Sequence, residues 1–175
     1  MGDKDIVDPY AKGVCEKCFY NFDNYSYGAY WGTYWPDVSP NSIDLPNATI
    51  IEDDAFNYCS NLRKINIPNV IEIGEDAFQQ SGVEMVDLPN ATTVNTGAFR
   101  YSPVKYLIAP KLETTGWYAF SSTKIKDLNL PKLQTIGPYS FAYCGELESI
   151  CIPSASYTGR DAFIGCTSLV EVNLP

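Results

Sequence analysis

The chain has 175 residues, a formal net charge of −9 at pH 7 and no histidine. This acidic balance argues against nucleic acid and anionic membrane surfaces as partners, since both bind basic proteins. No apolar run reaches the length of a membrane span. Without histidine there is no Ser-His or Cys-His pair, and the carboxylates that could serve glycoside hydrolysis lie on an exposed turn rather than in a cleft. We therefore expect a protein that is not an enzyme, has no cofactor and does not insert into a membrane.

Residues 1–41 differ from the rest of the chain and hold ten of its 24 aromatic residues. We expect this leader to cap the apolar end of the repeat array that follows. The alternative is a glycan-binding platform, in which Trp31 and Trp35 stack on sugar rings. Cys15-x-x-Cys18 also lies here, but zinc would need two more ligands, and the chain has no histidine and no second CxxC to supply them. A local disulfide and two free thiols both stay open for this pair.

From residue 42 to 175 the chain repeats one template, shown by the segment LRKINIPNVIEIGEDAF at 62–78. Its prolines recur every 21 or 22 residues, and a phenylalanine follows each of the first six by ten positions. The prolines are Pro46, Pro68, Pro89, Pro110, Pro131, Pro153 and Pro175; the phenylalanines are Phe56, Phe78, Phe99, Phe120, Phe141 and Phe163. Such a period predicts a repeat solenoid of about six coils, each burying its apolar side against its neighbours.

Within each coil the residues before the proline alternate in hydrophobicity, which predicts a short strand that the proline ends. Inward positions are Ile43/Leu45, Ile65/Ile67, Val86/Leu88, Leu107/Ala109, Leu128/Leu130, Ile150/Ile152 and Val172/Leu174. A second inward row is Ile51, Ile73, Val94, Thr115, Ile136 and Thr158, and the repeat phenylalanines should form one buried stack. The glycines at 74, 116, 137 and 159 are expected at turns with positive φ. Cys59, Cys144 and Cys166 share a slot with Ser81, Ser102 and Thr123, which predicts small, inward packing residues.

These residues resemble the BspA-like leucine-rich repeats, also called the Treponema pallidum type. Residues 59–78 and 144–163 nearly reproduce that family's pattern, C-x-x-L-x-x-I-x-L-P-x-x-L-x-x-I-G-x-x-A-F. The resemblance covers residues 42–175 and leaves the leader out. It implies a curved, right-handed leucine-rich-repeat solenoid with parallel strands on its concave face. It also implies a cell-surface role in adhesion and protein binding, and similar coils occur in prophage-encoded proteins.

The outward strand positions are mostly polar, but Met85, Tyr106 and Ile108 interrupt this ladder at its centre. A contiguous apolar island on a polar face usually marks contact with a partner. The polar flanks of the predicted site are Asp87, Asp127 and Asn129. Coverage of the island by neighbouring side chains is the alternative.

Two turn features have structural and functional interpretations. Asp53/Asp54 and Glu75/Asp76 should crowd one turn, as a solvated acidic face or, alternatively, a calcium site. Trp117, Tyr118, Pro138 and Tyr139 form a second stripe, for which aromatic stacking between coils is the simplest explanation.

We therefore expect a non-enzymatic, extracellular or cell-surface module that binds a protein or glycan through its concave sheet, although the sequence shows no export signal. The alternative is a structural or prophage-encoded assembly protein that uses its end faces. Val172 and Leu174 point into a coil that the sequence does not complete, and the last strand has an unpaired edge. Two explanations stay open: the chain is a fragment of a longer protein, or a second copy covers this end in an end-to-end homodimer, which we expect.

Overall fold

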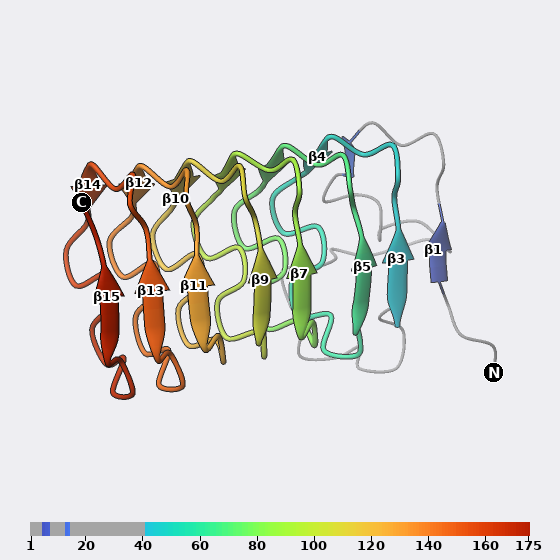
Figure 1. The fold of residues 1–175 in the computed structure, drawn as a ribbon. Coiled ribbons are helices and arrows are strands. Elements are labelled where there is room, and N and C mark those ends of the chain that lie inside the picture. The colour runs from blue at the N-terminus through green and yellow to red at the C-terminus, as the bar shows by residue number, and fades with distance from the viewer. Residues whose placement is uncertain (1–4, 8–12, 15–40) are drawn as a thin grey trace.

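The computed structural model describes residues 5–7, 13–14 and 41–175, and these form a parallel β-solenoid (Figure 1). The sequence-based expectations for Cys15, Cys18, Trp31 and Trp35 lie outside the described residues. No helix in the described part of the chain is long and apolar enough to cross a membrane. The predicted fold class is confirmed.

Each coil contributes one three-residue strand and one two-residue strand. The three-residue strands are β3 (Ser42–Asp44), β5 (Lys64–Asn66), β7 (Met85–Asp87), β9 (Tyr106–Ile108), β11 (Asp127–Asn129), β13 (Ser149–Cys151) and β15 (Glu171–Asn173). The two-residue strands are β4 (Ile50–Ile51), β6 (Glu72–Ile73), β8 (Thr93–Val94), β10 (Thr114–Thr115), β12 (Thr135–Ile136) and β14 (Tyr157–Thr158). Every pairing is parallel, and equivalent residues of successive coils face one another, as Ile43 faces Ile65. The sequence period is therefore the physical period of the stack.

Two short strands of the leader join these ladders. Strand β1 (Asp5–Val7) pairs with β3, and β2 (Gly13–Val14) pairs with β4, both in parallel. The leader thus adds one strand to each ladder at the side of the first coil (Figure 1).

The core is a column of phenylalanines, as the sequence predicts. Consecutive rings from Phe56 to Phe163 lie 5.1 to 5.6 Å apart between centroids, within 13° of parallel. Five of the six side chains are fully buried, and Phe163 in the last coil is half-buried. Because each ring contacts one ring above and one below, the column couples neighbouring coils.

The inward strand positions are buried through most of the array. Ile43, Val86, Leu107, Leu128 and Ile150 are at most 9% exposed. Val172 and Leu174 are 55% and 42% exposed, as expected for positions in an uncompleted coil, whereas the predicted burial of Thr158 is wrong because its side chain is exposed. Among the described residues no further coil covers these positions, so their side chains are exposed although they point inward.

The predicted role of the glycines is wrong, and the structure gives a different one. Gly74, Gly116, Gly137 and Gly159 do not have positive φ; two positions later Asp76, Tyr118, Tyr139 and Asp161 do, with φ between 51° and 56°. A Cβ on Gly116 would lie 2.5 Å from the backbone nitrogen of Thr96 in the preceding coil. These glycines are needed because successive coils approach closely there, and not because the backbone is left-handed.

The small slot after each phenylalanine is filled as expected. The thiol of Cys144 and the hydroxyl of Ser102 donate to the phenylalanine carbonyl of the preceding coil, at 3.2 and 2.5 Å. Cys166 makes the same contact with the carbonyl of Phe141 at 3.2 Å. Burial raises the pKa of Cys59 to about 12 and that of Cys166 to about 11. These thiols are therefore packing groups, protonated at neutral pH and poor nucleophiles.

Replacing Phe99 by alanine should lower the free energy of unfolding by about 3–5 kcal/mol, because the column would contain a cavity that its neighbours fill only partly. Denaturant unfolding measures this, with the exposed Tyr106→Ala as the matched aromatic control. A loss below about 1 kcal/mol for Phe99→Ala would show that the column is not the core.

Replacing Gly116 by alanine should destabilise the fold by about 1–3 kcal/mol, because the added methyl group would overlap the backbone of the preceding coil. Gly145→Ala is the control, since the nearest atom to a Cβ there is 3.8 Å away. Thermal melting of both variants tests the assignment. Equal melting temperatures would contradict the close approach.

Candidate functional site

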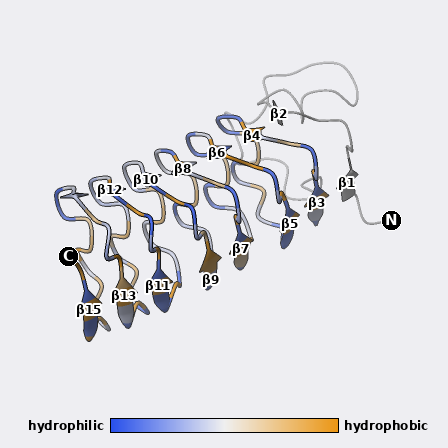
Figure 2. Ribbon diagram, turned by 45° about the horizontal axis from the view of Figure 1, so that its top comes forward, coloured by the Kyte–Doolittle hydropathy of each residue, from blue (hydrophilic) through white to orange (hydrophobic). Residues whose placement is uncertain are grey.

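The outward positions of β7 and β9 form one exposed apolar patch, called here the central patch (Met85, Tyr106 and Ile108). These side chains belong to residues that are 52%, 65% and 47% exposed. The strand register places Met85 opposite Tyr106, and Asp87 opposite Ile108. Figure 2 shows β9 in orange between β11 and β7, with β11 in blue. The predicted island therefore exists, and neighbouring side chains do not cover it.

On either side of the central patch, side chains of adjacent coils bond to one another. Asn66 donates to Asp44 at 2.7 Å, and Ser149 donates to Asp127 at 2.6 Å. Of the predicted flanking residues, Asp127 therefore already has a hydrogen-bond partner in the neighbouring coil. In the described coils the side chains of Asp87 and Asn129 have no such partner.

The ladder of three-residue strands is interrupted on both sides of β7 and β9. Hydrogen bonds join β1-β3-β5, β7-β9 and β11-β13-β15 as three separate sheets, whereas the two-residue strands form one continuous sheet. In paired coils the residue after the strand donates to the next coil, as Leu45 does to Asn66 at 2.9 Å. The equivalent bond from Ile67 to Asp87 is absent in these coils. The central patch therefore lies on a separate two-stranded sheet.

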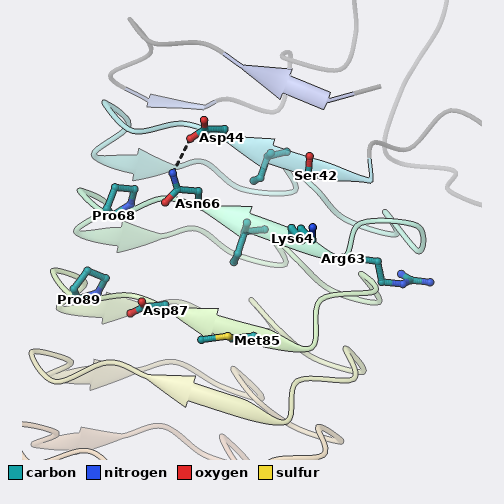
Figure 3. A pocket seen from close by; sticks show the side chains of 11 residues that line it. Ser42, Asp44, Arg63, Lys64, Asn66, Pro68, Met85, Asp87 and Pro89 are labelled. Carbon is teal, nitrogen blue, oxygen red and sulfur yellow. Dashed lines mark hydrogen bonds between the residues drawn. The ribbon is translucent and has the colours of Figure 1, made fainter. Parts of the chain in front are cut away.

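A groove of about 520 Å³ crosses the interruption between β5 and β7 (Figure 3). Its lining includes Ile65, which is half-buried although the equivalent Ile43 and Val86 are fully buried. Figure 3 shows Asp44 and Asp87 toward the proline end of the strands, and Lys64 and Arg63 toward the other end. Met85 lines both the groove and the central patch, so the two surfaces are continuous.

The second aromatic stripe is stacked between coils, as expected. The rings of Tyr118 and Tyr139 lie 4.9 Å apart and within 10° of parallel. The guanidinium of Arg100 lies 4.6 Å from the Tyr118 ring centroid and 4.7 Å from that of Tyr101. This arrangement stabilises the turns through aromatic and cation–π contacts. Trp117, at 56% exposed, lies outside the stack.

In the acidic turn, carboxylates of two adjacent coils repel one another. Burial and the nearby carboxylates of Asp76, Asp53 and Asp54 raise the pKa of Glu75. Burial also raises the pKa of Asp76, while a hydrogen bond from Gln79 and the charge of Arg100 oppose the shift. Within residues 41–175 no group of three or more acidic or cysteine side chains is placed to hold a metal ion. The turn therefore offers no ready-made calcium site.

Comparison with known families assigns the repeats. The BspA type leucine rich repeat region (6 copies) matches residues 34–144 and 71–175, which is more than half of the chain. The chain belongs to this BspA-type family. Proteins of this repeat class are interaction scaffolds and are typically not enzymes. A comparison with curated protein sequences gives no match.

The fold of this BspA-type chain also occurs in a solved structure, and two further solved leucine-rich repeat proteins are similar to it in part. A leucine-rich repeat protein of T. pallidum is 21% identical with a TM-score of 0.61, over 75% of this chain and 68% of that one. A leucine rich cell surface protein of Faecalibacterium prausnitzii is 16% identical with a TM-score of 0.48, over 97% of this chain and 71% of that one. A leucine-rich repeat protein of Bacteroides ovatus is 18% identical with a TM-score of 0.41, over 77% and 60%.

Sequence reasoning located the central patch of this BspA-type chain but missed the groove beside it. Lys64 and Asp44 are outward strand positions, and each fits the polar ladder that the sequence predicts. The groove depends on the missing hydrogen bonds between β5 and β7. The repeat pattern gives no signal for them, because β5 and β7 carry the same alternation as the paired strands.

Replacing Glu75 by glutamine should raise the melting temperature at pH 7. Its carboxyl has a raised pKa in the folded state, so its ionised form destabilises the fold above that pKa, and the penalty disappears as the pH falls below its ordinary value. The gain should therefore shrink toward pH 4 and in high salt. Thermal melting across pH tests this, with Glu113→Gln as the exposed control. A gain that grows at acid pH would contradict the repulsion.

Proposed function

We propose that this chain is a non-enzymatic protein-binding module of the cell surface, which contacts its partner through the face formed by the three-residue strands. The observation that carries the proposal is the central patch: three large apolar side chains exposed together on an otherwise polar ladder. The family resemblance supports the extracellular location and the adhesion role.

A protein partner fits this surface better than a glycan does. Sugar rings are held by flat aromatic side chains with polar neighbours, and the central patch contains one aromatic ring beside two aliphatic side chains. Tyrosine and methionine are enriched at the cores of protein interfaces, where charged residues are depleted. Around the patch lies a polar rim that includes Asp87 and Asn129, as in interfaces between proteins.

The test compares proteins retained by immobilised wild-type chain with those retained by Met85→Asp and by Tyr106→Asp. At least one protein should be lost from both variants, because a carboxylate at either position would be desolvated in the contact. The melting temperature of both variants should stay close to that of the wild type, since both side chains already face solvent. Trp117→Asp, an exposed aromatic outside the patch, is the control that should keep the partner. Retention of the same proteins by all variants would contradict the proposed site.

Self-association through the last coil is a second candidate, favoured by the exposed apolar side chains there. Val170, Val172 and Leu174 are 86%, 55% and 42% exposed, and among the described strands β15 pairs only with β13. A second copy could extend the sheet at this edge and cover them.

Light scattering on the 175-residue chain should then show dimers that increase with concentration, with modest affinity because one coil end offers little area. Val172→Lys should make the chain monomeric. A wild-type chain that stays monomeric at high concentration would exclude this candidate and leave the central patch unaffected.

A further inference from the structure

The groove between β5 and β7 has features that a regular ladder lacks. The two strands are not hydrogen-bonded, and Ile65, an inward residue, is half-buried where its equivalents in β3 and β7 are covered. The lining of the groove therefore includes the apolar side chains of both Ile65 and Met85. At about 520 Å³ it is within the size range of specific binding pockets.

The two ends of the groove carry opposite charges. Lys64 lies at one end and Asp87 at the other (Figure 3), and within residues 41–175 neither side chain has a hydrogen-bond or ion-pair partner. Two other carboxylates of the same face are engaged: Asp44 accepts from Asn66, and Asp127 accepts from Ser149. Lys64 and Asp87 therefore present an unpaired cation and an unpaired anion to an occupant.

From these features we infer that the groove holds an extended segment of the partner protein, with an acidic residue at Lys64 and a basic residue at Asp87. Lys64 begins its strand and Asp87 ends the neighbouring one, so their positions differ by two residues along the strand direction, about 7 Å. Successive side chains on one side of an extended polypeptide have the same separation. The segment thus carries its two opposite charges two positions apart.

Apolar contacts between the partner segment and the groove also support this inference. The methylene groups of the segment's basic side chain lie over Ile65 and Met85, as long charged side chains commonly cover apolar surface. Because Met85 also belongs to the central patch, the segment continues directly onto Tyr106 and Ile108. This inference rests on the proposed function, since it names the chemistry of the partner at one end of that face.

The probe is a display library of random twelve-residue peptides, selected in parallel on immobilised full chain and on its Lys64→Glu variant. Selection on the wild type should enrich peptides with an acidic and a basic residue two positions apart. On Lys64→Glu a carboxylate replaces the ammonium group beside Arg63, so the enriched peptides should lose the acidic residue that faces Lys64 and keep the basic residue that faces Asp87. Synthesised wild-type binders should bind Lys64→Glu roughly tenfold more weakly or worse.

Lys132→Glu is the matched control, because Lys132 is an exposed lysine in a turn outside the groove. It should select the same peptides as the wild type, and thermal melting should show that both variants are folded. Peptides that bind Lys64→Glu and wild type equally, or a selection that enriches no charge pattern, would overturn the inference. If such peptides still depend on Tyr106, measured with Tyr106→Asp, the groove assignment fails and the proposed function stands.

Discussion

Stacking of equivalent side chains at one fixed spacing is the constraint on which the whole structure depends. The phenylalanine rings repeat at 5.1 to 5.6 Å, close to the spacing of hydrogen-bonded strands. A coil of 21 or 22 residues cannot enclose a core of its own, so its apolar side becomes buried only when the next coil covers it. The half-buried Phe163 and the exposed Val172 show the same rule where no further coil lies over them.

This constraint explains why a repetitive scaffold can carry an irregular binding face. Inward positions must hold side chains that fill the core. Outward positions of the three-residue strands face solvent, so their residue type can differ from coil to coil. The continuous sheet of two-residue strands and the phenylalanine column keep the coils in register. The other ladder can then lose hydrogen bonds beside β7 and β9 without loss of the fold. The groove and the central patch both lie at this interruption.

The sequence predicts those features that repeat and fails where one coil differs from its neighbours. The Phe99 column, the small slot of Cys144 and the exposure of Tyr106 all follow from position within the period. The role of Gly116 was misassigned, because a glycine that recurs at one place in four of the six coils has two physical explanations: positive φ or a close backbone contact. The φ angles of the backbone and the contacts around each glycine distinguish these two explanations. The half-burial of Ile65 depends on hydrogen bonds between two coils, which residue types alone do not determine.

The central claim is that each coil is an interchangeable unit defined by one period, and coil deletion tests it most directly. Removal of residues 90–110, one full period of 21 residues, takes out Phe99 with β8 and β9, joins Pro89 to Lys111 and keeps the remaining phenylalanines and strands in register. Removal of residues 90–100 takes away half a period and places turn residues in the core. Circular dichroism with thermal melting should show a cooperatively folded β-protein for the first deletion and an unfolded or aggregated chain for the second. Equal loss of structure in both deletions would contradict the account.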